Sequence, residues 1–223
     1  MRLEVIRAGL VAYDEALRWQ ERLVEERLAG GPDRLVLLTH PAVVTLGRGA
    51  EAEHVLASPE GLAARGVEIH ETPRGGDVTW HGPGQLVAYP VFGLPPERRN
   101  VKRYVTDLEE VVIRTLRAFD IEAQRVDGLR GVWVGREKIA AIGVRIWRWV
   151  TSHGLALNVS PDLSFFGLIV PCGISDRGVT SLAALLASPP SMETVQSHLL
   201  QAFIDVFGYT EVAQRDASPR YDR

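Results

Sequence analysis

Hydrophobic positions along the chain follow two spacings, one typical of helices and one typical of strands. Apolar residues recur every three or four positions over residues 11–28 and 100–119, which predicts two amphipathic helices, the second with Asn100 as its N-cap. Short apolar runs bounded by glycine, proline or polar residues predict strands. These strands are expected at residues 3–7, 35–38, 43–46, 67–70, 86–92 and 152–159.

The second half of the chain adds a hairpin and three helices. Residues 131–134 and 138–150 are expected to form the two strands of the hairpin, with a turn at 135–137. The helices are expected at residues 59–65, 181–186 and 191–207.

Such closely spaced strands leave too little chain for the crossovers that parallel pairs need. We therefore expect one α+β domain over residues 1–215, with a mixed or mostly antiparallel sheet flanked by helices. Residues 216–223 are expected to be a frayed tail.

Composition narrows the class of protein. The chain has 223 residues, 46% of them hydrophobic and 24% charged, which is close to the average of globular domains. The formal net charge of -3 argues against a dedicated nucleic-acid binder. No apolar run approaches the roughly 20 residues of a membrane-spanning helix, and the first residues lack a signal-peptide pattern. We expect a cytoplasmic protein with no nucleic-acid or membrane partner.

Cysteine and histidine usage limits the possible chemistry. Cys172 is the only cysteine, so an intrachain disulfide and a cysteine-rich zinc site are excluded. The six histidines show no metal-ligand spacing, and no Gly-x-Ser-x-Gly motif of a serine hydrolase occurs. These patterns give no support to a metal site, and we expect neither a metal nor a cofactor.

Cys172 itself has two interpretations. A lone cysteine is most often an inert, buried side chain. Here it lies between Pro171 and Gly173 in a predicted loop, where the glycine would allow backbone N–H groups to approach a reacting carbonyl. The competing interpretation is therefore that Cys172 is a catalytic nucleophile.

Lys138 is one of only two lysines, the other being Lys102. A lone lysine is normally a solvated charge. Lys138, however, opens an apolar strand and shares a face with Ala140 and Ile142 by strand alternation. If that face is buried, the ammonium group needs a partner or a purpose. A neighbouring ammonium group would favour a thiolate, although the sequence does not place Lys138 beside Cys172.

Residues 72–85 form the most unusual stretch of the chain. They contain four glycines and two prolines beside Arg74, Asp77, Trp80 and His81. No Gly-Lys-Ser/Thr follows, so the stretch is not a P-loop. It is either an elaborate tight turn or a loop that wraps closely around a ligand, and the cost of ordering so many glycines favours the ligand.

Four segments together resemble the lipoyl(octanoyl) transferase family. They are residues 74–85 (RGGDVTWHGPGQ), 138–143 (KIAAIG), 152–159 (SHGLALNV) and 171–174 (PCGI). Each segment is modestly specific, but the four in this order are highly specific, and the resemblance extends from about residue 3 to 208. Trp80 replaces a common tyrosine, and Trp147 stands where relatives often carry a polar or basic side chain.

The resemblance implies a fold similar to the catalytic domains of biotin and lipoate protein ligases. It implies octanoyl-[acyl-carrier-protein]:protein N-octanoyltransferase activity, the first step of protein lipoylation, with Cys172 as the acyl-accepting nucleophile and Lys138 as the residue that activates it. The substrate-binding residues implied by the family segments are Arg74, Gly75, Gly76, Asp77, Val78, Thr79, Trp80, His81, Ala141, Ile142, Gly143, Gly154, Leu155 and Ala156.

The implied donor is octanoyl-acyl carrier protein. The implied acceptors are apo lipoyl domains of 2-oxoacid dehydrogenase E2 subunits and the glycine-cleavage H protein, and a monomer is expected. Three alternatives stay open at this point. They are an ATP-dependent lipoate or biotin-type protein ligase, a binding protein without catalysis, and an enzyme that uses another acyl donor such as acyl-CoA.

Overall fold

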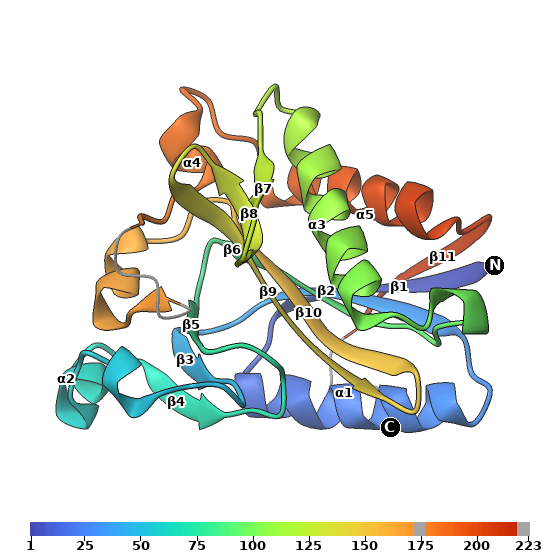
Figure 1. Ribbon diagram of the computed structural model, residues 1–223, viewed down its shortest axis with the longest axis horizontal. Coiled ribbons are helices and arrows are strands. Elements are labelled where there is room, and N and C mark those ends of the chain that lie inside the picture. The colour runs from blue at the N-terminus through green and yellow to red at the C-terminus, as the bar shows by residue number, and fades with distance from the viewer. Residues whose placement is uncertain (172–176, 218–223) are drawn as a thin grey trace.

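An eight-stranded mixed sheet forms the centre of the molecule (Figure 1). The structure is a computed structural model, and it describes residues 1–171 and 177–217. Strand β1 runs parallel to β2 and β11, and the other neighbours are antiparallel, so the expected mixed sheet is confirmed. In spatial order the strands are β11 (Glu211–Asp216), β1 (Arg2–Leu10), β2 (Asp33–Thr39), β6 (Gln85–Val91), β10 (Val150–Asn158), β9 (Glu137–Trp147), β8 (Leu129–Val134) and β7 (Gln124–Val126).

Helices cover both faces of this sheet. Helices α3 (Val101–Arg117) and α5 (Met192–Phe207) lie on one face and α1 (Tyr13–Leu28) lies on the other (Figure 1). Strand β2 is buried on both sides, because Leu35 and Leu37 belong to the α3/α5 core while Val36 and Leu38 belong to the α1 core. That arrangement explains why this strand reads as a continuous apolar run.

The helix ends follow the capping signals in the sequence. The Asn100 side chain accepts a hydrogen bond from the backbone of Arg103 at the start of α3, as expected. Ser191 does the same for Thr194 at the start of α5, and Gly208 ends that helix with a φ of 77°. The expected helix α4 is a single turn, Leu182–Leu185.

A smaller three-stranded sheet packs beside the large one. It has the order β4 (Glu68–Glu71), β3 (Val43–Leu46), β5 (Val78–His81), and helix α2 (Pro59–Ala64) connects β3 to β4. The short 3-10 helices are η1 (Ala52–His54), η2 (Pro96–Arg98) and η3 (Leu163–Leu168). The chain passes directly from β5 into β6, so the glycine-rich stretch joins the two sheets.

One expected strand is divided in the structure, and two strands were not expected. The strand expected at 138–150 is two strands, because Arg148 and Trp149 form a two-residue turn with φ values of 49° and 64°. Neither residue is the asparagine or glycine that normally signals such a turn. Strands β7 and β11 were not predicted from the pattern, and every residue of β11 is exposed.

The tail was expected to begin at residue 216, but the structure extends ordered pairing to residue 217. Asp216 pairs with Arg7 in β11, and the Ala217 amide donates to the Arg7 carbonyl oxygen. Residues 218–223 lie outside the described part of the chain. Within the part that the structure describes, no helix has the length and apolar character needed to cross a membrane.

Candidate active site

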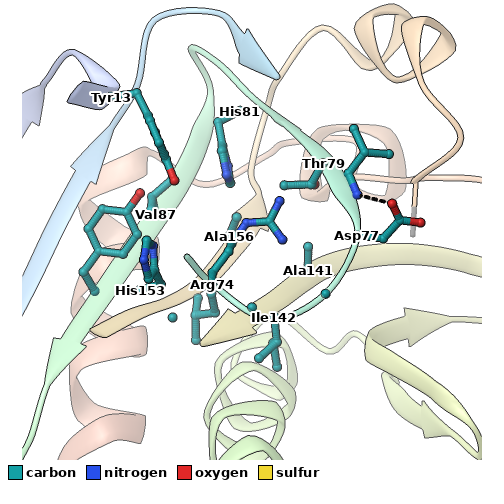
Figure 2. A pocket seen from close by; sticks show the side chains of 16 residues that line it. Tyr13, Arg74, Asp77, Thr79, His81, Val87, Ala141, Ile142, His153 and Ala156 are labelled. Carbon is teal, nitrogen blue, oxygen red and sulfur yellow. Dashed lines mark hydrogen bonds between the residues drawn. The ribbon is translucent and has the colours of Figure 1, made fainter. Parts of the chain in front are cut away.

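A pocket is lined by residues of the glycine-rich loop and of strands β5, β6, β9 and β10, with Tyr13 from the start of α1 (Figure 2). It brings together all of the expected substrate-binding residues except Gly75 and Trp80. The lining residues are Tyr13, Arg74, Gly76, Asp77, Val78, Thr79, His81, Val87, Tyr89, Ala141, Ile142, Gly143, His153, Gly154, Leu155 and Ala156.

Trp80 and Gly75, the two residues outside the pocket, make structural contacts instead. The Trp80 side chain is 1% exposed and stacks on Phe165, with ring centroids 5.1 Å apart, in the core beneath the small sheet. The Gly75 amide donates to the Val144 carbonyl oxygen at 2.9 Å, which fastens the glycine-rich loop to β9.

Glycine is required where the backbones approach most closely. Gly143 and Gly154 are opposite each other in the β9–β10 pair. A Cβ atom on Gly154 would lie 2.2 Å from the Ala88 carbonyl oxygen, and one on Gly143 would lie 3.0 Å from the Gly75 carbonyl oxygen. Larger residues would therefore push the glycine-rich loop and β6 away from the pocket.

Arg74 places a cation in the wall of the pocket. Its Nη2 donates to both the carbonyl oxygen and the Oγ1 of Thr45, each at 2.8 Å, and Nη1 donates to the Gly75 carbonyl oxygen at 3.2 Å. These bonds hold the guanidinium group in one orientation. Burial is the main cause that lowers the pKa of His81 and His153, and the Arg74 charge lowers both further because it would repel an imidazolium.

Three buried histidines lie in or beside the pocket, because His81 and His153 line it and His40 packs against His81. Burial lowers the pKa of His40 to about 4 and that of His81 and His153 to about 3. The Val11 carbonyl oxygen, 2.7 Å from His40 Nδ1, can only accept, so Nδ1 carries the proton and Nε2 accepts from the Tyr89 hydroxyl.

His153 has an unusual backbone conformation. Its φ is 55° in the middle of β10, a region that side chains other than glycine rarely adopt. Its amide donates to Gln20 Oε1 of α1 at 2.7 Å. Strain of this kind is found most often at functional sites, and it directs the imidazole to the pocket (Figure 2).

His54 contacts the lining residue Asp77, a link that the sequence pattern did not indicate. Its Nδ1 lies 2.6 Å from Asp77 Oδ2, and Asp77 Oδ1 accepts from the Val78 amide at 2.7 Å. The His54 carbonyl oxygen accepts from the Val170 amide at 2.8 Å. The 52–54 turn therefore links the glycine-rich loop to the chain that leads toward residue 171.

Lys138 is buried, with 5% of its surface exposed, and Ala140 and Ile142 on the same strand face are buried with it, so the ammonium group needs a partner or a purpose. Its Nζ lies 4.8 Å from the centroid of the Trp133 ring, a favourable position for a cation. The Lys138 amide donates to the Gly178 carbonyl oxygen at 2.9 Å, and its carbonyl oxygen accepts from the Thr180 amide at 3.0 Å. Lys138 is not one of the lining residues of the pocket.

Cys172, the expected nucleophile, lies outside the described residues. The chain on its two sides is described, and it is attached at Val170 to His54 and at Gly178 to Lys138. The structure thus brings the glycine-rich loop and the β9–β10 glycines together. It also attaches the chain that follows the Cys172 segment to the Lys138 main chain.

Four lining residues were absent from the expected set, namely Tyr13, Val87, Tyr89 and His153. His153 falls inside a motif that the sequence singles out, so its signal was present. Tyr13 begins a helix and the other two lie in an apolar strand, where a sequence pattern gives no functional signal. In residues 1–171 and 177–217 no group of three histidine, cysteine or acidic side chains could hold a metal ion.

Comparison with known proteins matches the lipoyl protein ligase A/B catalytic domain to residues 12–204. An octanoyltransferase of Chloroflexus aggregans is 52% identical over 92% of this chain and 95% of its own length. One from Chloroflexus aurantiacus is 53% identical over 89% of this chain and 91% of its own length.

Solved structures agree in fold. A lipoate-protein ligase A bound with ATP has a TM-score of 0.77 at 17% identity, covering 95% of this chain and 88% of that one. A biotin protein ligase from Aquifex aeolicus, in complex with biotin and ATP, has a TM-score of 0.56 at 14% identity over 92% and 70% of the two chains. The expected ligase-like fold is therefore confirmed.

The fold and the family match define a catalytic domain of the lipoate protein ligase type. The chain belongs to the lipoyl protein ligase A/B catalytic domain family and, within it, to the octanoyltransferases. The resemblance expected from the four sequence segments is thereby confirmed.

Proposed function

We propose that the protein transfers an octanoyl group from octanoyl-acyl carrier protein to a specific lysine of apo lipoyl domains, through an octanoyl-Cys172 thioester. Octanoyl transfer in protein lipoylation, and hence an acyltransferase, follows from membership of the octanoyltransferases. One observation carries the role of Lys138. It is a buried lysine whose main chain is bonded to Gly178 and Thr180, directly after the segment that contains Cys172.

In the first half-reaction the Cys172 thiolate attacks the carbonyl carbon of the donor thioester. The carbon–sulfur bond to the carrier breaks, and the carrier thiol leaves with the proton that Cys172 gave up. Lys138 supplies the charge that favours the thiolate and passes this proton between the two sulfur atoms. The thioester already stores the free energy of acyl transfer, so the reaction needs no ATP.

In the second half-reaction the acceptor lysine attacks octanoyl-Cys172 and forms an amide. A free lysine has a pKa of about 10.4 and must be neutral to attack. The proton it loses goes, by way of Lys138, to the departing sulfur of Cys172. Splitting the transfer in this way lets two carrier proteins use one site in turn, with ping-pong kinetics.

The pocket supplies the site for the acyl chain. Val87, Ile142, Leu155 and Ala156 give it apolar walls. Each buried methylene contributes about 0.8 kcal/mol, so removing two carbons weakens binding by roughly tenfold. The glycines at 143 and 154 keep the walls open on the side of the glycine-rich loop.

The proposed acceptors are the lipoyl domains of 2-oxoacid dehydrogenase E2 subunits and of the glycine-cleavage H protein. Lipoyl domains as acceptors in general follow from the family, whose solved structures include a bipartite lipoate protein ligase of Thermoplasma acidophilum and its E2 lipoyl domain. The proposed setting is the cytoplasm, with the protein acting as a monomer.

Intact-protein mass spectrometry tests the proposal. The protein is mixed with octanoyl-acyl carrier protein without ATP, and an apo lipoyl domain is then added. We expect one octanoyl group on Cys172 that moves to the lysine of the domain, and no adduct on Cys172→Ser.

The competing ligase gives a different result. Transfer only when ATP and free octanoate are supplied, unaffected by Cys172→Ser, would overturn the thioester mechanism. Equal loading from octanoyl-CoA would overturn the choice of the carrier protein as donor.

A further inference from the structure

A series of hydrogen-bonded, buried side chains connects the pocket to residues 178–180, which are bonded to the main chain of Lys138. His81 Nδ1 lies 2.6 Å from Gln85 Oε1, and Gln85 Nε2 lies 2.9 Å from Asn158 Oδ1. Asn158 Nδ2 lies 3.0 Å from the Thr180 carbonyl oxygen. All of these side chains are buried, and Thr180 is bonded in turn to Lys138.

The direction of every hydrogen bond in this series is fixed by the group at its end, the Thr180 carbonyl oxygen. A backbone carbonyl oxygen can only accept, so the amide nitrogen of Asn158 must face Thr180 and its oxygen must face Gln85. Gln85 must then present its nitrogen to Asn158 and its oxygen to His81. The Trp80 carbonyl oxygen, 3.3 Å from Gln85 Nε2, independently requires the same orientation.

His81 therefore carries its proton on Nδ1. Burial is the main cause that lowers the pKa of His81 to about 3, so the ring is neutral and Nε2 is a hydrogen-bond acceptor. His81 lines the pocket, and its ring points into it (Figure 2). The pocket, which Arg74 also lines, thus presents a fixed acceptor nitrogen.

We propose that Gln85 and Asn158 are positioning residues that hold the His81 proton on Nδ1, so that Nε2 accepts a hydrogen bond from the acceptor lysine during the second half-reaction. This inference rests on the proposed two-step function. His81 takes no proton in this role. It holds the neutral amine by one N–H bond, and the proton that the amine loses follows the route through Lys138.

Of the two reacting groups, the thioester carbonyl and the acceptor amine, only the amine can donate a hydrogen bond to His81 Nε2. The thioester carbonyl offers only lone pairs, which a lone pair on Nε2 would repel. The neutral amine has two N–H donors, and one can bond to Nε2 while the nitrogen lone pair attacks. A fixed acceptor in a buried site also avoids reorganisation when the amine arrives.

The proton position on His81 can be measured without any activity assay. Long-range ¹H–¹⁵N correlation spectra of histidine-labelled protein distinguish the two neutral tautomers and the imidazolium. We expect His81 to show a protonated Nδ1 and an unprotonated Nε2 from pH 8 to pH 5. The charged and titratable groups that face it are Tyr13 of α1, His40, Arg74 and His153. A protonated Nε2 on His81 in this range would overturn the inference.

The Gln85→Glu variant tests the role of the proton position. The new carboxylate favours a charged ring and converts Nε2 from an acceptor into a donor. We expect octanoyl loading within about threefold of the wild type and transfer to the lipoyl domain slower by roughly tenfold or more, the effect of losing one hydrogen bond of about 1.4 kcal/mol. Gln124→Glu, the same change at an exposed position of β7, is the control and should leave both steps unchanged.

Separate measurement of the two steps keeps the outcomes distinct. If Gln85→Glu loads and transfers normally, the inference fails while the proposed function stands. If the wild type forms no octanoyl-Cys172, the proposed function fails, and the tautomer of His81 is still read from the spectra. If Gln85→Glu is too unstable for kinetics, Gln85→Met, which removes the oxygen that accepts the Nδ1 proton, should shift the His81 signals toward a mixture of tautomers. Unshifted signals would overturn the inference.

Discussion

The Thr180 amide donates a hydrogen bond to the Lys138 carbonyl oxygen at 3.0 Å, and the Lys138 amide donates to Gly178 at 2.9 Å. The chain that follows the Cys172 segment therefore lies against the start of β9 like one more short strand. These are main-chain bonds, so they are independent of the side chain at position 138. A change of that side chain should alter chemistry without detaching the segment.

Replacing Lys138 with methionine should lower octanoyl transfer by about 10²–10⁴-fold, the usual contribution of a proton-transferring group. The fold should persist, because methionine preserves the aliphatic part of the buried side chain and its contact with Trp133. Transfer rate and thermal midpoint measure the two effects. Lys102→Met, at the exposed second lysine, is the matched control. Full activity of Lys138→Met would refute the proposed role of this residue.

A second prediction concerns Gly154. Alanine at this position would place its Cβ 2.2 Å from the Ala88 carbonyl oxygen, inside the β6–β10 pair. The backbone must shift, so we expect Gly154→Ala to lower the free energy of unfolding by about 1–3 kcal/mol or more. The shift also narrows the pocket, and the KM for the octanoyl donor should rise.

Gly167→Ala is the matched control for that change, because a Cβ there would have no atom within 4 Å. Urea unfolding and steady-state kinetics of both variants check the prediction. Equal stability of Gly154→Ala and Gly167→Ala would show that β6 and β10 are not as close as the structure has them.

The parts of the fold that could be predicted are those where one local signal dominates. Residues 43–46 form a strand with the expected bounds, because an apolar run there ends at a glycine. Strand β11 could not be predicted, because its residues are polar and exposed and are held only by edge pairing with β1. The turn at Arg148 and Trp149 was missed for a similar reason, since side chains at positive φ carry no pattern.

The candidate site divides in the same way. The glycine-rich loop and the β9–β10 glycines were identified because close backbone approach needs glycine. The bond between Gln85 and Asn158 joins residues 73 apart, and the His54–Asp77 contact depends on a turn with no repeating pattern. Such contacts arise from tertiary packing, so only the structure reveals them.

The buried histidines predict a loss of stability in acid. The pKa of His40 is about 4 in the folded protein because burial disfavours its charged form, whereas an unfolded histidine has a pKa near 6.5. Below about pH 6.5 the unfolded chain therefore binds more protons than the folded one. Each such histidine should then lower the free energy of unfolding by up to about 1.4 kcal/mol per pH unit until its folded pKa is reached.

Urea unfolding of wild type and His40→Gln at pH 7, 5.5 and 4.5 tests this expectation. Glutamine can still donate to the Val11 carbonyl oxygen and accept from the Tyr89 hydroxyl, the two bonds that His40 makes. We expect the variant to lose less stability than the wild type between pH 6.5 and pH 4.5, with little difference in pH dependence above 6.5. The exposed His198→Gln controls for the substitution itself. Parallel stability curves for wild type and His40→Gln would mean that His40 is already charged in the folded protein or accessible to water.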